Sequence, residues 1–168
     1  MTSSRADVSG RVARVLLFLV VLAAMLFGLI QLIPSRIHNP SANVEPPWDS
    51  PQTRQLAASA CFDCHSNRTR SYWYEKVAPI SWWIKHHVDD GRQALNFSEY
   101  DPNKHRSGSS IGRRVENGSM PPSSYTWLGR HPDAKLSAAD KAALVAGLEK
   151  TYGSAVGVTD REGGRRGG

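Results

Sequence analysis

The longest hydrophobic run of the chain lies near its N-terminus. Residues 15–33 read VLLFLVVLAAMLFGLIQLI and are interrupted only by Gly28 and Gln31. As a helix rising about 1.5 Å per residue, the run would reach about 28 Å, close to the thickness of the hydrocarbon core of a bilayer. It lacks the polar stripe that a helix on the surface of a globular domain shows. The pattern therefore predicts one membrane-spanning helix over residues 15–33.

A cleaved signal peptide is the alternative for this run. Signal peptides have apolar cores of about 7 to 15 residues, followed by a small-residue cleavage site. This run is longer, and the sequence at its end, QLIPSRIHNP, has no A-x-A pattern. Three arginines and one aspartate lie in residues 1–14, and the positive-inside rule predicts that this end is cytoplasmic. We therefore expect a single-pass protein of the cell inner membrane whose remaining domain is periplasmic.

Beyond residue 50, the hydrophobic positions recur at helical spacing, and no alternating strand pattern of useful length is present. Helices are predicted over residues 53–66, 78–95, 109–118 and 136–153. The first is a short helix candidate with Leu56, Ala60 and Cys64 four apart on one face. The last carries the clearest signals, because Ser137 is a good N-cap, Asp140 takes a capping-box position and Gly153 follows the end. Its apolar stripe consists of Leu144, Val145 and Leu148.

The remaining segments set the limits of the domain. Residues 34–50 are rich in proline, which removes backbone donors and opposes helix, so they predict an extended linker. Residues 153–168 are Gly-rich and charged, and we expect them to be disordered. Residues 51–152 are expected to form one small all-α domain.

Composition and charge add two constraints. The net charge of +6 is spread thinly, whereas a nucleic-acid-binding protein concentrates basic residues on one face, so we expect no nucleic-acid partner. A domain of this size buries proportionally little surface. The two cysteines of the chain cannot form a disulfide framework, and such small domains usually need a staple. A large apolar cofactor would supply the missing core.

Both cysteines lie in one short motif, ACFDCHSN, which covers residues 60–67. C-x-x-C-H is the attachment signature of c-type haem. Residues three apart lie on the same helix face, so the thiols of Cys61 and Cys64 can reach two vinyl groups of one porphyrin. The imidazole of His65 then points at the iron. The motif predicts one covalently bound haem c with His65 as the proximal iron ligand.

Two other chemistries remain open for this motif. A structural zinc site needs four ligands, often from two spaced pairs, but the chain has two cysteines and His65 is too close to Cys64 to complete an ordinary finger. A thioredoxin-like redox dithiol is expected near a βαβ pattern, and the sequence shows none. Both are weaker alternatives, although a lone C-x-x-C-H also arises by chance.

A second axial ligand is expected on a loop. Met120 lies in NGSMPPSSY, after a glycine turn and before two prolines that fix the backbone. Met and His together fill the coordination sphere of the iron and raise the haem potential, which suits electron transfer. The alternatives are a gap-filling core role for Met120, or ligation by His86 or His87 instead.

Aromatic side chains would line the haem. The stretch SYWYEKVAPISWW covers residues 71–83, and two further aromatics follow the Met120 loop. Most of them are expected to be ordinary core residues. We expect Trp83, Tyr125 and Trp127 to contact the haem.

Taken together, these motifs resemble the bacterial haem-binding domain family of cytochrome c-like proteins. The matching hallmarks are CxDCHS at residues 61–66, WYxxxAPxSW at 73–82, GRxxLNFSEW at 91–100, MPPxxY at 120–125 and LHPxAxLS at 128–137. Tyr100 stands where the family usually has Trp, and Gly129 and Arg130 lengthen the last motif. The resemblance covers residues 51–152. It implies covalent haem and a cytochrome c-like helical fold on the single N-terminal transmembrane helix, but no specific reaction.

These expectations combine in one hypothesis, a membrane-anchored monohaem c-type cytochrome that carries one electron at the outer face of the inner membrane. It would be an electron-transfer protein rather than an enzyme, because no nucleophile with a base and no paired acids form a recognisable motif. Its partners would be the membrane and redox proteins that act as donor and acceptor, including a larger respiratory or photosynthetic complex. The alternatives are a haem-based sensor or small peroxidase-like enzyme with a displaceable distal ligand, or a subunit that uses haem as a fold staple.

Overall fold

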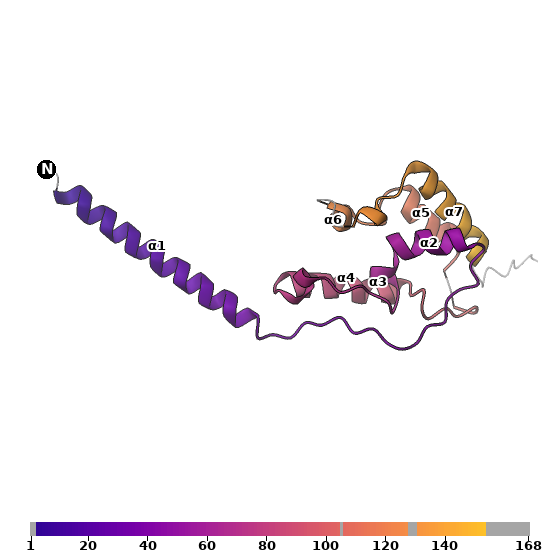
Figure 1. Ribbon diagram of the computed structural model, residues 1–168, viewed down its shortest axis with the longest axis horizontal. Coiled ribbons are helices and arrows are strands. Elements are labelled where there is room, and N and C mark those ends of the chain that lie inside the picture. The colour runs from indigo at the N-terminus through magenta and orange to yellow at the C-terminus, as the bar shows by residue number, and fades with distance from the viewer. Residues whose placement is uncertain (1–2, 105, 128–130, 154–168) are drawn as a thin grey trace, which may run out of the picture. The chain divides into compact units, whose positions relative to one another are not determined.

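The computed structural model describes residues 3–104, 106–127 and 131–153 (Figure 1). Over these residues the regular secondary structure is helical, without strands, and an isolated bridge pairs Val44 with Glu99. The all-α fold class predicted from the hydrophobic spacing is confirmed. The tail expected over residues 153–168 lies outside the described residues after Gly153.

The helical elements follow one another along the chain and divide into two compact units. They are α1 (Ser3–Ile30), α2 (Pro51–Ala60), α3 (Phe62–His65), η1 (Trp73–Lys76), α4 (Ile80–Ala94), α5 (Gly108–Glu116), α6 (Ser123–Thr126), η3 (Pro132–Ala134) and α7 (Ala138–Tyr152). The N-terminal unit comprises Met1–Ile37 and Ser71–His86, and the helical unit comprises His38–Arg70 and His87–Gly168. Part of the domain expected over residues 51–152 therefore groups with the N-terminal helix.

The apolar run forms α1. Its stretch Ser9–Ile30 contains an 18-residue window with a mean hydropathy of 2.7 and is long and apolar enough to cross a membrane, as predicted. The helix ends at Ile30 rather than at residue 33. Pro34 explains the early end, because proline has no N–H and disfavours helical backbone in the residue before it.

Helix α7 forms as its sequence signals predict. Ser137 Oγ accepts the N–H of Asp140 at 3.0 Å. Gly153 ends the helix with a φ of 58°, a backbone conformation that glycine adopts without a steric penalty. The residues of the predicted apolar stripe, Leu144, Val145 and Leu148, are all buried.

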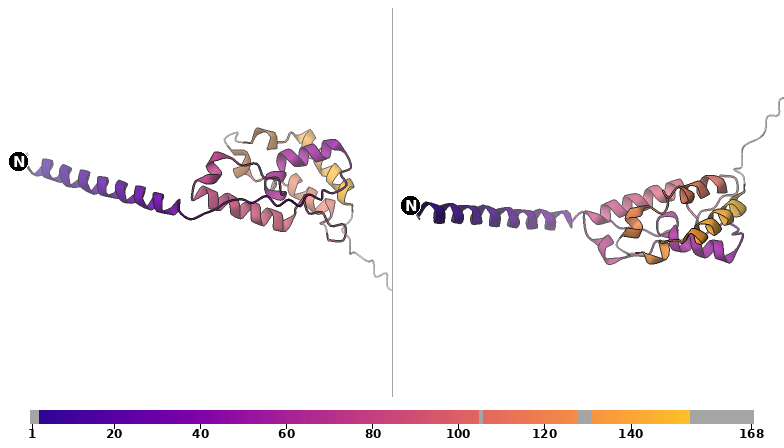
Figure 2. Two further views of the ribbon diagram at one scale, coloured as in Figure 1. Left: turned by 60° about the horizontal axis from the view of Figure 1, so that its bottom comes forward. Right: turned by 90° about the horizontal axis from the view of Figure 1, so that it is seen from above.

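The core of the helical unit lies where α7 packs against α5 and α2 (Figures 1 and 2). Small residues permit the close approach. A Cβ on Gly112 of α5 would lie 3.0 Å from Val145 Cγ1, and one on Gly147 of α7 would overlap the side chain of Thr53 in α2. The buried core comprises Ala57, Phe62, Phe97, Val115, Leu144, Val145, Leu148 and Tyr152. Because Phe62 lies between the two cysteines, this core extends into the C-x-x-C-H motif.

The helix predicted over residues 53–66 is interrupted at the motif. Helix α2 starts behind the N-cap Ser50 and ends at Ala60, and α3 begins at Phe62. Between them, Cys61 has a φ of −126° and a ψ of −33°, away from ordinary helical values. The predicted helix is therefore present in two parts, because Cys61 starts a separate turn.

The proline-rich segment expected as an extended linker packs along the helical unit over residues 38–50. Val44 N–H donates to the Ser98 carbonyl at 2.8 Å, and the Val44 carbonyl accepts from Tyr100 N–H at 2.9 Å. Trp48 packs against the hydrophobic core. The prolines keep the segment free of helix, as expected, but it is part of the fold rather than a detached spacer.

Candidate functional site

The cysteines and the histidine of the motif lie on one turn of backbone. The Cys61 carbonyl accepts the N–H groups of both Cys64, at 3.2 Å, and His65, at 2.9 Å. The two sulfurs are not joined in a disulfide. The structure thus brings together the three residues that the motif singles out.

The His65 ring is held by two backbone carbonyls at the C-terminal end of α4. Its Nδ1 lies 2.8 Å from the Gly91 oxygen and 3.1 Å from the Leu95 oxygen. Because a carbonyl can only accept, Nδ1 carries the proton and Nε2 keeps its lone pair. Burial lowers the pKa of His65, which favours this neutral ring. A neutral imidazole with its Nδ1–H held in this way is the form that ligates a metal.

Gly91 also allows α4 to approach the motif. A Cβ at this position would lie 2.5 Å from the Cys64 carbonyl oxygen and 3.2 Å from Cys64 Cβ. Sequence reasoning did not select Gly91 or Leu95 as site residues. Both belong to GRQALNFSEY at residues 91–100, so a signal was present, but a backbone acceptor leaves no mark in the residue type.

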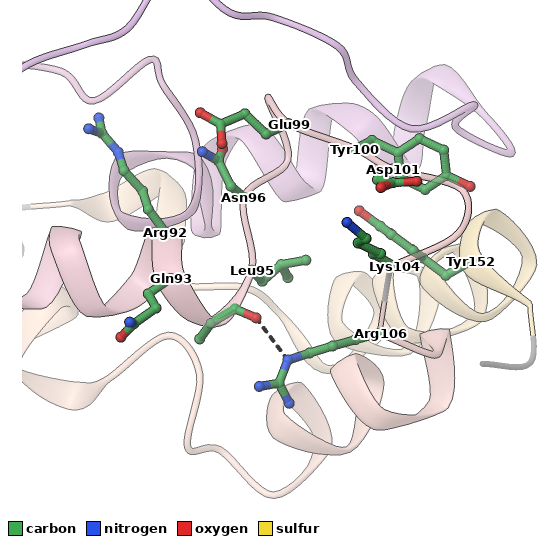
Figure 3. Close-up of a pocket in the computed structure, with 11 residues that line it drawn as sticks. Arg92, Gln93, Leu95, Asn96, Glu99, Tyr100, Asp101, Lys104, Arg106 and Tyr152 are labelled. Carbon is green, nitrogen blue, oxygen red and sulfur yellow. Dashed lines mark hydrogen bonds between the residues drawn. The ribbon is translucent and has the colours of Figure 1, made fainter. Parts of the chain in front are cut away.

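A polar cavity of about 340 Å³ lies elsewhere in the helical unit (Figure 3). It is lined by Arg92, Gln93, Ala94, Leu95, Asn96, Glu99, Tyr100, Asp101, Lys104, Arg106 and Tyr152. On its wall, Arg106 Nε donates to the Ala94 carbonyl at 2.8 Å. Cys61, Cys64 and His65 do not line it, so this cavity is not the site of the motif.

The segment after the motif is fixed to α4 by Arg92. Its guanidinium donates to the Ser66 carbonyl at 2.9 Å, to Thr69 Oγ1 at 3.0 Å and to Asn39 Oδ1 at 2.7 Å. Thr69 Oγ1 in turn donates to the Asp63 carbonyl at 2.7 Å. One side chain of α4 therefore fixes both the segment that follows the motif and part of the proline-rich segment.

Asn67 joins the same segment to the residues after α4. Its side-chain amide donates to Glu99 Oε1 at 2.9 Å, and its Oδ1 accepts from Asn96 Nδ2 at 2.9 Å. Its backbone N–H donates to Ser98 Oγ at 3.1 Å. Asn67 and Ser98 are buried, and buried polar groups are stable only when they are hydrogen-bonded. Polar groups of CHSN and LNFSEY thus serve as hydrogen-bond partners for one another.

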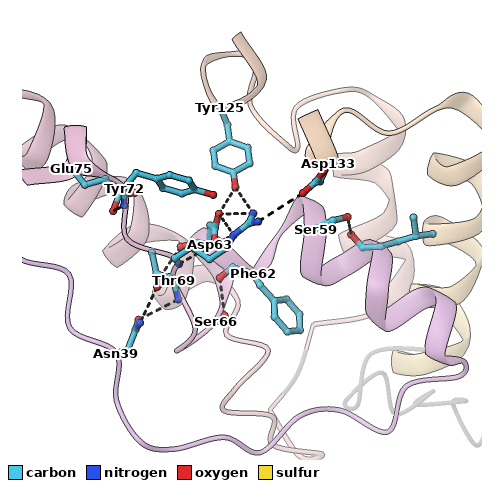
Figure 4. A network of polar contacts seen from close by, with 12 residues as sticks. Asn39, Ser59, Phe62, Asp63, Ser66, Thr69, Tyr72, Glu75, Tyr125 and Asp133 are labelled. Atoms are coloured by element: carbon cyan, nitrogen blue, oxygen red, sulfur yellow. Dashed lines mark hydrogen bonds and ion pairs between the residues drawn. The ribbon is translucent and has the colours of Figure 1, made fainter. Parts of the chain in front are cut away.

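Asp63, inside the motif, binds the loop that follows Met120 (Figure 4). Its buried carboxylate accepts a hydrogen bond from the Tyr125 hydroxyl. It also accepts from Arg70 Nη2 at 2.9 Å and from the Arg70 backbone N–H at 3.1 Å. Burial and the Asp63 carboxylate raise the pKa of Tyr125, so the phenol stays protonated and donates. The Tyr125 ring stacks on the His131 ring, with centroids 3.9 Å apart.

Met120, the expected distal ligand, lies in the helical unit with its side chain 38 % exposed. Its backbone N–H donates to the Arg114 carbonyl at 2.9 Å. Gly118 has a φ of 73°, so the glycine turn predicted before Met120 is present. The hydrogen bond between Tyr125 and Asp63 brings the loop that carries Met120 to the motif.

The other expected site residues are more exposed than Tyr125. Trp127 is 67 % exposed, and Trp83, which belongs to the N-terminal unit, is 49 % exposed. Of the histidines weighed against Met120, His86 is exposed and His87 is half-buried. Tyr125 is therefore the expected aromatic that the structure ties to the motif.

The structure also bears on the two alternatives for the cysteines. A redox dithiol relies on a lowered thiol pKa, whereas burial, with Cys64 adding to the effect, raises the pKa of Cys61 to about 12. For zinc, the part of the chain that the structure describes holds no group of three or more His, Cys, Asp or Glu side chains that could bind a metal ion. Neither alternative gains support from the geometry.

Comparison with known protein families assigns residues 25–150 to the haem-binding domain. Comparisons with curated proteins and with solved structures give no match. The matched range covers well over half of the 168 residues and contains the C-x-x-C-H motif, Met120 and the end of the apolar helix. The chain therefore belongs to the haem-binding domain family.

Proposed function

We propose that the protein is a membrane-anchored monohaem c-type cytochrome that carries one electron at the outer face of the inner membrane. The observation that carries this proposal is the His65 ring, whose Nδ1 is bonded to the carbonyls of Gly91 and Leu95. This leaves Nε2 as the ligand for iron. Family membership supports haem as the bound group, and the ligand set supports electron transfer as its task.

The donors present fit a covalently held haem. Cys61, Cys64 and His65 share one turn, and the thiols are not oxidised to a disulfide. Cys61 and Cys64 would hold the haem through thioether bonds to its two vinyl groups, each made by addition of one S–H across the vinyl double bond without a leaving group. The chain has two cysteines, which accounts for one haem.

The residues of the chain would divide the remaining tasks. His65, with its ring oriented by its two carbonyl partners, and Met120 would bind the iron. Tyr125 and Trp127, both of the helical unit, would shield the ring system from water. Bound haem supplies an iron that accepts and releases one electron, and His/Met ligation raises its potential and leaves no open position.

The apolar helix α1 supplies the anchor in this proposal. Three arginines precede the apolar run, which favours a cytoplasmic N-terminus and a periplasmic haem unit. A tether confines the haem near its partners at a high effective concentration. One electron enters from a reduced redox protein and leaves to an oxidised one, so the protein is a carrier, alone or within a larger membrane complex, and not an enzyme.

The test uses full-length protein purified in detergent. Mass spectrometry is expected to show one haem that stays attached after denaturation. The absorption spectrum of the reduced protein is expected to be that of a thioether-linked haem. Met120→Leu should remove the long-wavelength absorption of methionine-ligated ferric haem and open the iron to carbon monoxide. Met25→Leu makes the same exchange within α1 and should leave both properties unchanged.

Two outcomes would change the conclusion. A protein without covalently attached haem would exclude a c-type cytochrome. Ready binding of carbon monoxide by the unaltered reduced protein would favour the second candidate, a haem-based sensor or small peroxidase-like enzyme with a displaceable distal ligand. The exposure of the Met120 side chain, 38 %, is the observation in favour of this candidate, because an exposed ligand is displaced more easily than a buried one.

A further inference from the structure

We propose that the segment from Trp73 to Ile80, here called the interfacial segment, lies in the headgroup layer of the membrane that α1 enters. The inference rests on the membrane-spanning role of α1 in the proposed function. It adds a second contact with the bilayer, made by residues far along the chain from α1. Both parts belong to the N-terminal unit.

The interfacial segment is hydrogen-bonded to the chain where it leaves α1. Gln31 is the first residue after this helix. Its Nε2 donates to the Ala78 carbonyl at 3.1 Å, and its Oε1 accepts the Ala78 N–H at 2.9 Å. A little further on, Ser35 Oγ donates to the Ser81 carbonyl at 3.2 Å. Three hydrogen bonds thus fix residues 78–81 beside residues 31–35.

This pairing sets the height of the interfacial segment along the membrane normal. The apolar span ends at Ile30, so Gln31 lies at the edge of the hydrocarbon. A chain extends at most about 3.6 Å per residue, so Ile80 lies within about 7 Å of Ala78. The headgroup layer is about 5 to 7 Å thick on each side of a bilayer. Ala78 therefore lies at the inner boundary of this layer, with Ile80 within its reach.

Large apolar side chains are exposed in the two segments that these hydrogen bonds join, within the N-terminal unit. Trp73 is 76 % exposed and Ile80 is 45 % exposed. On the helix side, Leu32 is 77 % exposed and Ile33 is 56 % exposed. Leu32 and Ile33 follow Gln31, just beyond α1, whose apolar side chains are exposed as well. Both segments thus expose apolar side chains beyond the C-terminal end of the membrane-spanning helix.

The chemistry of the interfacial segment fits lipid headgroups. Tryptophan is enriched at membrane–water interfaces because its ring is largely apolar and its N–H is polar. Lys76 is exposed, and a lysine at this height attracts anionic lipids. A protein partner would have to displace the headgroups that already occupy the space beside Gln31. The occupant we infer is therefore the bilayer itself.

Fluorescence in lipid vesicles tests this inference. Full-length, haem-loaded protein is inserted into phosphatidylcholine and phosphatidylglycerol vesicles that are unbrominated, brominated near the headgroups or brominated deep in the chains. The Trp73 signal is the difference between the unaltered protein and Trp73→Phe. For each protein, the fluorescence in brominated vesicles is divided by that in unbrominated vesicles, so that quenching by haem cancels before the two proteins are compared. We expect this signal to lose more intensity with shallow than with deep bromines.

A pair of matched variants tests the hydrogen bonds to Ala78. Gln31→Leu removes both bonds and should reduce the loss of Trp73 fluorescence in shallow-brominated lipid. Gln55→Leu makes the same exchange at an exposed residue of α2 and should not change it. Equal quenching of Trp73 in both variants would show that the hydrogen bonds of Gln31 do not hold the interfacial segment in the headgroup layer.

Flotation of the vesicles separates this inference from the proposed function. Protein that floats with the vesicles but shows no quenching of Trp73 by either brominated lipid overturns the inference and leaves anchoring and haem binding intact. Protein that does not float overturns the anchoring and the inference together. Protein that floats without haem, with Trp73 quenched, supports the inference while overturning the proposed electron transfer.

Discussion

At the scale of single residues, the orientation of His65 depends on neighbours that contribute no side-chain chemistry. Gly91 and Leu95 act through their carbonyl groups. Gly91 also acts through its missing side chain, which would collide with Cys64. Partners of this kind fix the ring and tautomer of a ligating histidine. Because a substitution cannot remove a carbonyl, Gly91 is the residue through which this arrangement can be tested.

Gly91→Ala should force α4 away from the motif. The new Cβ would lie 2.5 Å from the Cys64 carbonyl oxygen, and overpacking of this kind costs about 1–3 kcal/mol of unfolding free energy. We also expect less haem per protein, because His65 loses its fixed orientation. Absorption spectra and thermal unfolding measure the two effects. Gly28→Ala is the control, since a Cβ there meets nothing within 4 Å. Equal stability and haem content in the two variants would contradict the close approach of α4 to Cys64.

The sequence predicts the residues of a single motif better than the residues that other elements contribute. Cys61, Cys64 and His65 share one turn, as their spacing predicts. Gly91 and Leu95 follow His65 by 26 and 30 positions. Their contact with His65 depends on how α4 folds back onto α3, and no local pattern of residue types encodes that.

At the scale of elements, the hydrogen bond between Asp63 and Tyr125 joins α3 to α6. It connects a buried carboxylate with a phenol, and hydrogen bonds to charged groups are stronger than neutral ones. Met120 precedes α6 in the same loop. The bond therefore restricts where this loop can carry Met120.

Tyr125→Phe should loosen the loop while leaving Asp63 paired with Arg70. We expect a loss of about 1.5–3 kcal/mol in unfolding free energy, the usual range for a hydrogen bond to a charged group. We also expect faster binding of carbon monoxide to the reduced protein, because Met120 is less restrained. Thr126→Val removes a neighbouring hydroxyl that bonds within its own turn at 3.4 Å and serves as the control. Binding as slow as in the control would show that Tyr125 does not restrain the loop.

Elements with their own start and stop signals were predictable. The helix expected over residues 78–95 is α4, and the caps of α7 lie where the sequence puts them. The break at Cys61 was not predictable. The segment that follows this turn is held by hydrogen bonds to Arg92 and Asn96, and these form only once the chain has folded.

At the scale of the whole molecule, the proline-rich segment belongs to the fold, and Glu45 is its main electrostatic link. The Glu45 carboxylate accepts from Arg54 Nε at 2.7 Å and from Trp48 Nε1 at 2.8 Å, and lies 3.1 Å from Arg68 Nη1. Prolines predict the absence of helix equally well for a free spacer and for a packed segment. Only these tertiary contacts distinguish the two, which is why the sequence could not.

Glu45→Gln should reduce stability in a pH-dependent way. The hydrogen bond from Arg54 holds the pKa of Glu45 below its ordinary value of 4.5, so ionised Glu45 stabilises the fold above pH 4.5 and the contribution is lost as pH falls through the lowered pKa. We expect a loss of about 1 kcal/mol at pH 7, because the arginines are partly exposed. The difference from the unaltered protein should shrink below pH 4.5. Thermal unfolding between pH 3 and 7 measures it, and a pH-independent difference would contradict the ionic contribution.

The two residues between the cysteines limit how far the C-x-x-C-H motif can be transplanted. The Phe62 ring packs 5.5 Å from that of Phe97 in the core, and Asp63 holds Tyr125 and Arg70. A design that grafts C-x-x-C-H onto another helical scaffold would carry over the cysteines and the histidine but neither set of partners. The scaffold would have to offer an apolar pocket on one side of the turn and a hydrogen-bond donor with a cation on the other.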